Sequence, residues 1–138
     1  DVAIGILETP VTDVKPINIR TTKPVSADTI SVGFGCSRTE ISEYVMQPIA
    51  ENDFERTIVH INPVEKSNNG ICHGDSGGAS IGLDEQGKPE LVGVHFSSNF
   101  KSSSHDVRVD NIFVRDFLET LSVRFHLKIC GLDRVCPK

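Results

Sequence analysis

The chain has 138 residues, a length that suits one domain with a core of its own. Its formal net charge is −5, and its 14 lysines and arginines form no basic run, so neither nucleic acid nor a membrane is an expected partner. No apolar stretch reaches the length that a membrane-spanning helix needs. Because the chain begins at Asp1, with no methionine and no signal-peptide pattern, we expect a mature fragment or a chain cut from a longer one.

Short apolar runs along most of the chain predict strands. Residues 2–7 are apolar enough for a first strand, and the prolines within residues 8–24 predict a connector that lies over a surface. Further strands are predicted at residues 30–34, 41–46, 57–61, 79–81, 91–96 and 107–109. About six short strands, with turns roughly every ten residues, predict an all-β fold built as a closed antiparallel barrel.

The hydrophobic period changes at Ile112 and predicts a C-terminal helix. Asp110 or Asn111 is the expected N-cap. We expect the apolar side chains of this helix to form one face that packs on the barrel. The residues at helical spacing are Phe113, Val114, Phe117, Leu118, Leu121 and Phe125.

A glycine-rich turn at residues 74–78, with the sequence Gly-Asp-Ser-Gly-Gly, is the clearest sign of chemistry. Glycines let the backbone approach a substrate carbonyl where a Cβ would clash. The backbone N–H groups of Gly74 and Ser76 can then point to one place and bind the oxyanion of a tetrahedral intermediate. Ser76 is the candidate nucleophile. The alternative is a surface hairpin with an Asp-Ser turn and no chemistry.

The run from Cys72 to Gly78 resembles the active-serine motif of the chymotrypsin-like serine proteases. Four other segments resemble landmarks of that family and follow in the family's order. They are residues 1–7, which resemble the segment that opens with the triad aspartate, residues 15–17, which resemble the crossover between the two barrels, residues 33–35, which resemble a Gly-aromatic-Gly strand, and residues 91–94, which resemble the strand before the substrate-binding segment. The resemblance covers nearly the whole chain.

The resemblance implies the second, C-terminal barrel of the family's two-barrel fold, a six-stranded antiparallel β-barrel followed by an α-helix. The chain would then be the C-terminal half of a chymotrypsin-like serine protease domain. Its parts would be a strand and inter-barrel connector at residues 1–24, the barrel at residues 25–110, the helix at residues 111–128 and a cysteine-bearing tail at residues 129–138.

The activity that the resemblance implies is that of a serine endopeptidase working through an acyl-enzyme. Its triad roles are carried over from the family: Ser76 attacks the scissile carbonyl and Asp1 orients the catalytic histidine. The alternative for Asp1 is an ordinary solvated residue. In the family the histidine precedes the aspartate in the chain. The histidines here all follow Asp1, and they are His60, His73, His95, His105 and His126.

We therefore expect the catalytic histidine on an N-terminal barrel that this chain lacks, and the chain alone to be nearly inactive. That barrel and a polypeptide substrate are the expected partners, with a protein inhibitor as a further one. The alternative is a protease-like binding module that has lost catalysis and uses the old cleft to hold a partner. A purely structural β domain would explain the strands but not the serine turn.

The resemblance also assigns roles around Ser76. Asp75 would turn inward and form a salt bridge with the amine that zymogen cleavage creates. A buried carboxylate without its partner is costly, so we expect this loop to be mobile in an isolated fragment. Gly70 would form the base of the primary pocket, and because it carries no charge, strict specificity for arginine or lysine is not expected. The expected substrate-binding residues are Gly70, Ile71, His73, His95, Phe96, Ser97 and Ser98.

Three of these residues have more specific expectations. Ile71 would form an apolar wall, and His73 would either border the cleft or be a solvated bystander. The segment from Phe96 to Ser98 would pair with the substrate backbone as an added strand. Val94-His95 resembles the branch of the family that cleaves after glutamate, and the alternative is a histidine packed within a strand.

The four cysteines of this β-rich chain favour an oxidising compartment and hence secretion. The family usually ties the serine loop to the substrate-binding loop, but no cysteine lies between Phe96 and Arg108. We predict the pairs Cys36–Cys72 and Cys130–Cys136, although four cysteines allow three pairings and a tether to another segment stays open. Their spacing contains no CxxC pair, which disfavours a zinc site. No metal and no organic cofactor is implied.

Overall fold

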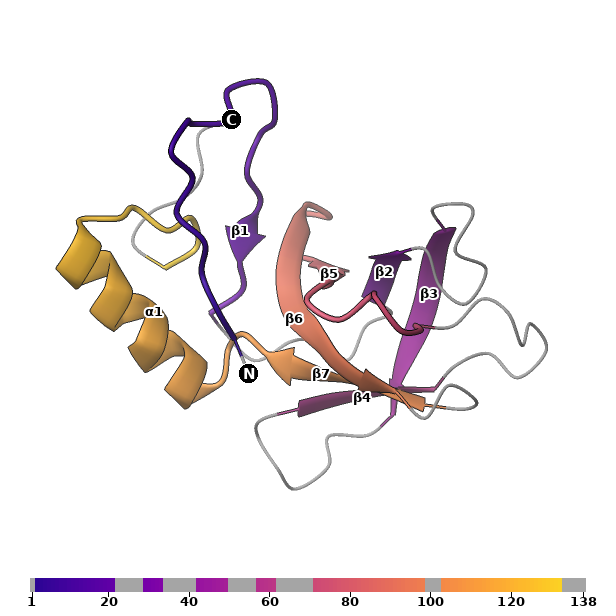
Figure 1. Cartoon of the computed structure of the whole chain (residues 1–138). Coiled ribbons are helices and arrows are strands. Elements are labelled where there is room, and N and C mark those ends of the chain that lie inside the picture. Colours follow the sequence, from indigo (N-terminus) through magenta and orange to yellow (C-terminus); the bar gives the residue numbers. More distant parts are fainter. Residues whose placement is uncertain are drawn as a thin grey trace.

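The computed structural model describes residues 2–21, 29–33, 42–49, 57–61, 71–98 and 103–132 (Figure 1). Along the chain the elements are β1 (Asn18–Ile19), β2 (Thr29–Gly33), β3 (Ser42–Ile49), β4 (Thr57–Ile61), β5 (Ala79–Leu83), β6 (Pro89–Ser98), β7 (Ser103–Arg108) and α1 (Ile112–Phe125). The prediction of a mostly β chain with one C-terminal helix is confirmed.

The strands form one sheet in the order β1-β6-β5-β2-β3-β4-β7, and β6 also pairs with β7. Each strand from β2 to β7 therefore has two antiparallel neighbours. The short strand β1 pairs in parallel with β6, with Asn18 opposite Glu90 and Ile19 opposite Leu91. Among the described residues the sheet is thus mixed and has seven strands, whereas the sequence predicted six antiparallel ones and no strand at β1.

The prediction of a strand at residues 2–7 is wrong. These residues form no ladder, and residues 3–17 are exposed throughout. Apolar composition alone does not make a strand, because the backbone N–H and C=O groups also need a neighbouring strand to bond with. We refer to residues 2–17 as the N-terminal arm. Figure 1 shows it as an irregular excursion beside β1, on the same side of the sheet as α1.

The arm ends in a firm attachment to the sheet. The Ile19 N–H donates to the Cys130 carbonyl at 2.9 Å, and the Arg20 N–H donates to the Leu91 carbonyl at 2.9 Å. The buried Arg20 guanidinium forms an ion pair with Glu90 at 2.7 Å. Residues 19–20 therefore join the C-terminal tail to β6.

Strand β6 contacts three other strands and bends between them. Its register shifts against β5, where Val92 is an extra residue, and again against β7, where Phe96 is an extra residue. Extra residues of this kind are β-bulges, which bend a strand and turn one side chain away from the regular alternation. The first bulge points Val92 into the core, with 1% of its surface exposed, and the second leaves Phe96 42% exposed.

Helix α1 packs on this sheet through a narrow stripe. Asn111 is its N-cap, because the Asn111 Oδ1 accepts a hydrogen bond from the Phe113 N–H at 2.8 Å. Val114 and Leu118 are buried with Val109 in one apolar cluster. The partly buried side chains packed against this cluster are Val2, Ile19, Leu91, Val94, Val107, Ile129 and Leu132.

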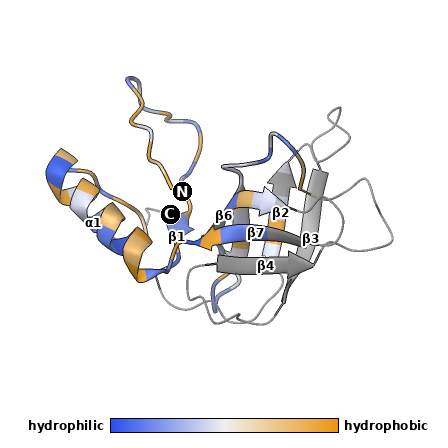
Figure 2. Cartoon of the chain, turned by 60° about the horizontal axis from the view of Figure 1, so that its bottom comes forward, coloured by the Kyte–Doolittle hydropathy of each residue, from blue (hydrophilic) through white to orange (hydrophobic). Residues whose placement is uncertain are grey.

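The predicted apolar face of α1 is only partly buried. Phe113, Phe117 and Phe125 are 60%, 37% and 47% exposed. Their aromatic rings therefore lie on the surface of the chain and not against the sheet. In Figure 2 apolar colours accordingly reach the outside of α1 and parts of the N-terminal arm.

Candidate active site

The candidate nucleophile lies on the turn before β5. We call residues 72–78 the serine turn. Within it the Asp75 N–H donates to the Cys72 carbonyl at 3.1 Å, and the Gly78 N–H donates to the Asp75 carbonyl at 2.9 Å. Gly74 and Gly77 have φ values of +102° and +87°, a conformation that side chains with a Cβ rarely adopt. The glycines of the motif are therefore required by the shape of this turn.

Strand β6 clamps the far end of the serine turn. The Gly77 N–H donates to the His95 carbonyl at 2.8 Å, and the His95 N–H donates to the Gly78 carbonyl at 2.9 Å. These two bonds hold Gly77 and Gly78, the residues that follow Ser76, against β6. Because β6 is itself paired on both sides, the turn rests on a rigid part of the sheet.

Ser76 is exposed on this turn. In the part of the chain that the structure describes, the Gly74 and Ser76 amides donate no hydrogen bond, whereas the Asp75, Gly77 and Gly78 amides all do. Two backbone donors beside an exposed serine are the elements that oxyanion stabilisation needs.

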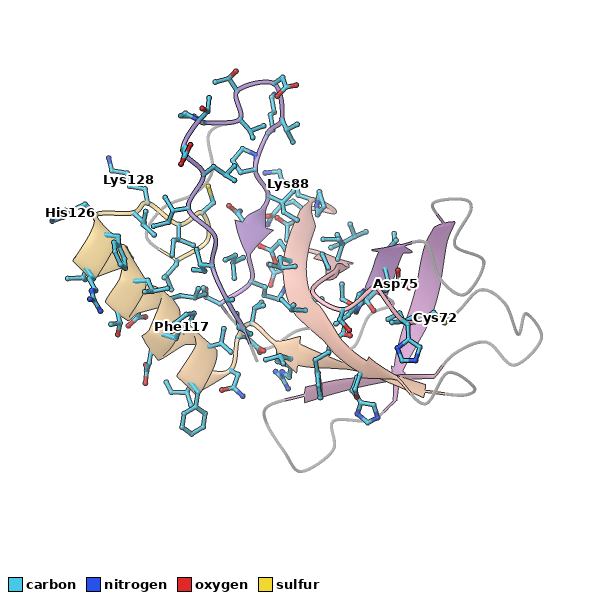
Figure 3. All side chains as sticks on the ribbon, in the orientation of Figure 1. Cys72, Asp75, Lys88, Phe117, His126 and Lys128 are labelled. Carbon is cyan, nitrogen blue, oxygen red and sulfur yellow. The ribbon has the colours of Figure 1, made fainter. Side chains whose placement is uncertain are left out.

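Asp75 turns into the protein, in the direction that the resemblance implied (Figure 3). It is 9% exposed, and its Oδ2 accepts a hydrogen bond from the Cys72 N–H at 2.9 Å. Its Oδ1 lies against Gly33, where an added Cβ would come within 2.7 Å of that oxygen. A glycine at position 33 therefore makes room for the carboxylate. The expected salt bridge of Asp75 with an N-terminal amine stays a prediction.

His95 is almost completely buried, with 2% of its surface exposed. Its Nδ1 lies 2.6 Å from the Asp106 Oδ1. Among the described residues, its Nε2 has no hydrogen-bond partner, so the Asp106–His95 pair does not act as the base of Ser76 in this structure. Of the two expectations for His95, a histidine packed within a strand describes this position better than a group that meets the substrate.

Two serines extend the contact between His95 and Asp106. The Ser80 Oγ donates to the Asp106 Oδ2, and the Ser31 Oγ lies 3.1 Å from the Ser80 Oγ. We call Ser31, Ser80, Asp106 and His95 the polar row. Its members belong to β2, β5, β7 and β6, and none is more than 2% exposed. Of these four residues only His95 could be recognised from the sequence, because the other three are ordinary strand residues until the sheet brings them together.

The remaining predicted substrate-binding residues lie near the serine turn or outside the described residues. Ile71 is buried, with 4% of its surface exposed, whereas His73 and Ser97 are exposed. Phe96 meets His105 edge to face, with ring centroids 6.1 Å apart. Ser98 is the last residue of β6. The predicted site residues outside the described part of the chain are Asp1 and Gly70.

Both cysteines in the described part of the chain, Cys72 and Cys130, are disulfide-bonded. Their predicted partners, Cys36 and Cys136, lie outside the described residues. The two pairings therefore stay predictions. A disulfide at Cys72 would fix the start of the serine turn, opposite the clamp that His95 provides at its end.

A family model described as Trypsin matches residues 1–112. The chain belongs to the trypsin family. No curated protein matches it. The trypsin-family match includes the whole serine turn and the whole polar row.

In the part of this trypsin-family chain that the structure describes, no three His, Cys, Asp or Glu side chains gather as ligands for a metal ion. Among the same residues, no helix has the length and hydrophobicity that crossing a lipid bilayer requires.

Proposed function

We propose that the chain is the serine-bearing half of a serine endopeptidase that cleaves peptide bonds through an acyl-enzyme. The observation that carries this proposal is the exposed Ser76 on a turn clamped to β6, where the Gly74 and Ser76 amides donate to none of the described residues. Membership of the trypsin family supports serine endopeptidase activity in general. The proposal extends that activity to particular residues of this chain.

In the proposed reaction the Ser76 hydroxyl attacks the scissile carbonyl and gives its proton to a histidine. The Gly74 and Ser76 amides donate to the oxyanion of the tetrahedral intermediate. The histidine then protonates the leaving amine as the C–N bond breaks, which leaves an ester on Ser76. Water attacks this ester, its proton passes through the histidine, and the serine is released. Asp1 would hold the histidine in its useful tautomer.

The histidine would come from an N-terminal barrel, which we propose as the partner of this chain. Large apolar side chains exposed on the N-terminal arm and on α1 support this proposal, because they favour a surface that another body covers. On the arm these are Ile4, Ile6, Leu7, Val11, Val14 and Ile17, and on α1 they are Ile112, Phe113, Phe117, Val123 and Phe125.

If the barrel contacts α1, Phe117→Asp should weaken the affinity between the barrel and this chain at least tenfold. Lys128→Asp, which lies beyond the helix, should leave that affinity unchanged.

Asp75 has a proposed role in activation. Its carboxylate is turned inward beside Gly33. A newly formed N-terminal amine would form an ion pair with this carboxylate, and the pair would hold the serine turn in place. The Cys72 N–H bond at 2.9 Å already draws the carboxylate into that orientation. Asp75→Asn should therefore lower the rate of acylation in the cleaved protein while leaving the uncleaved protein unchanged.

The substrate would lie along the end of β6, where Phe96 and Ser97 are exposed beside the serine turn. Ile71, His73, Ser98 and an uncharged Gly70 complete the proposed binding set, and the buried His95 is not part of it. Because that set offers no carboxylate for a basic side chain, cleavage should not be confined to arginine and lysine. A peptide panel that varies only the residue before the cleaved bond measures this preference directly.

The test of the proposed activity is hydrolysis of internally quenched peptides by the complete gene product. Ser76→Ala should lower kcat by about 10⁴-fold or more, because the nucleophile is lost. Gln86→Ala, in the exposed turn between β5 and β6, is the matched control and should leave kcat unchanged. Equal kcat values for Ser76→Ala and the unsubstituted protein would refute the proposal.

The alternative function is a binding module without catalysis. It predicts a gene product whose first barrel carries another residue in place of the catalytic histidine. A histidine-bearing barrel supports the enzyme. We also propose that the protein is secreted, which the disulfide-bonded Cys72 and Cys130 support.

A further inference from the structure

The polar row is almost completely buried. The largest side chains with less than 2% exposure are those of Val92, Asp106, Ser31 and Ser80, and only Val92 among them is apolar. Burying a carboxylate and an imidazole is costly, and apolar residues of similar size would stabilise the core more. A buried polar chain at this depth fixes one arrangement of the strands that carry it. Because His95 is bonded to Gly77 and Gly78, the arrangement that the polar row fixes includes the end of the serine turn.

The hydrogen bonds of the row have one direction. The Ser80 hydroxyl donates to the Asp106 Oδ2. An ionised carboxylate can only accept, so when Asp106 is ionised the His95 Nδ1–H donates to its Oδ1. Ser80 then accepts from Ser31 at 3.1 Å. The carboxylate therefore determines both the rotation of the His95 ring and the nitrogen that carries its proton. Ring rotation and tautomer of His95 are thus set from β7.

The ring of His95 in turn contacts the serine turn. An added Cβ on Gly78 would lie 3.0 Å from the His95 Cδ2 and 3.8 Å from its Nε2, so the ring edge lies directly under this residue. The backbone of His95 holds the same place through its bonds with Gly77 and Gly78. Ring and backbone of one residue thus hold the segment that follows Ser76.

We propose that Asp106 is a positioning residue for Ser76 that acts through His95. The carboxylate fixes the imidazole against Gly78, the imidazole fixes the end of the serine turn, and the turn presents the hydroxyl and the two free amides. Ser80 and Ser31 hold the carboxylate in its orientation. This inference rests on the proposed role of Ser76 as the nucleophile.

The test compares amide hydrogen exchange and the His95 tautomer in the ¹⁵N-labelled chain and in Asp106→Asn. The asparagine keeps the shape of the side chain but can offer an N–H to Nδ1, so the imidazole proton should move to Nε2, as long-range ¹H–¹⁵N correlations report. Exchange of the Gly77 amide should accelerate roughly tenfold, since its clamp is loosened. The Arg115 amide, which donates to Asn111 at the start of α1, should be unchanged.

Two further variants make the path of the effect visible. In a His95→Gln background, Asp106→Asn should no longer accelerate exchange at Gly77, because the residue that transmits the effect is gone. Ser80→Ala removes one donor and should give a smaller acceleration in a protein that keeps the carboxylate. Asp110→Asn is the control, since Asp110 pairs with Arg108 at 2.8 Å outside the row.

The proposal is overturned if Gly77 exchange does not change, if its acceleration persists in the His95→Gln background, or if the Arg115 amide accelerates equally. In the complete gene product, Asp106→Asn should also slow fluorophosphonate labelling of Ser76, and an unchanged rate would overturn the positioning role. Failure of the unsubstituted protein to label would refute the nucleophile and not the link from Asp106 to the turn, which the exchange data decide separately.

Discussion

Single glycines determine how closely the polar row and the serine turn approach each other. A Cβ on Gly78 would lie 2.8 Å from the Asp75 carbonyl oxygen. A Cβ on Gly93 would lie 2.9 Å from the Asp106 Cβ and 3.0 Å from its Oδ2. Real side chains essentially never come this close without a shift of the backbone. Gly78 belongs to the serine motif, whereas Gly93 is required by a carboxylate on the neighbouring strand.

The substitution Gly93→Ala tests this contact. It should lower the free energy of unfolding by about 1–3 kcal/mol, because the buried Asp106 cannot move aside without breaking its bonds. Urea unfolding measures the difference. Gly5→Ala is the matched control: an added Cβ there meets nothing within 4 Å, and the expected change is within about 0.5 kcal/mol. If Gly93→Ala lowers the free energy of unfolding no more than Gly5→Ala does, the surroundings of Asp106 have room for the added methyl group and the close contact is not tight.

At this scale the sequence predicts the nucleophile but not its support. Ser76 is recognisable because its neighbours Gly74 and Gly77 adopt positive φ angles, a requirement that leaves a local pattern. Asp106 and Ser80 leave no such pattern, because they lie 26 positions apart and meet only when β5, β6 and β7 pair. Burial of a polar residue is a property of the assembled sheet, so no local period predicts it.

Among the elements, α1 depends on its cap. The Asn111 side chain satisfies the Phe113 N–H, one of the donors that a helix start leaves without a partner. Asn111→Ala should therefore lower the free energy of unfolding by about 1 kcal/mol, measured by urea unfolding. Asn111→Ser keeps an acceptor at this position and should restore most of that loss. A serine variant as unstable as the alanine variant would mean that the side-chain acceptor is not the cause.

The joint between β1 and the tail is the second sensitive element. A Cβ on Gly131 would lie 2.0 Å from the Ile19 carbonyl oxygen, and Gly131 has a φ of +90°. Gly131→Ala should cost at least about 3 kcal/mol, since strain and a backbone clash combine. Gly87→Ala, at a φ of +75° with nothing within 4 Å, carries the strain alone and should cost about 1 kcal/mol. Thermal or urea unfolding that gives equal costs would argue against a tight β1 joint.

Strands and helices were predicted correctly where the local sequence pattern alone determines the element. The strand at residues 57–61 has the predicted bounds, and α1 begins at Ile112, where the period changes. The prediction failed at residues 2–7 and at β1, since both depend on whether a neighbouring strand is available. It also assigned Phe113 and Phe117 to a buried face, because periodicity identifies an apolar stripe but not which part of it the sheet covers.

Over the whole molecule, polar and apolar groups lie in unusual places. The interior holds the polar row, while apolar side chains remain exposed along the N-terminal arm and α1 (Figure 2). Such a chain buries less apolar surface than it could, so covalent links should matter more to its stability. The disulfides at Cys72 and Cys130 are therefore expected to contribute substantially.

Reduction tests this expectation. Dithiothreitol should lower the free energy of unfolding by about 2–4 kcal/mol for each bond lost, as followed by urea unfolding. Mass spectrometry of the unreduced, digested protein should find the pairs Cys36–Cys72 and Cys130–Cys136. A peptide that joins Cys72 to the tail, or unfolding that reduction does not affect, would contradict this account of the molecule.

The most direct measurement of the central claim is covalent capture of the nucleophile. The complete gene product would be treated with a fluorophosphonate, digested, and its modified residue located by mass spectrometry. The account predicts one phosphonylated residue, Ser76, and no modification in Ser76→Ala. An unmodified Ser76 in a protein whose histidine-bearing barrel is present, or a label on another serine, would contradict it.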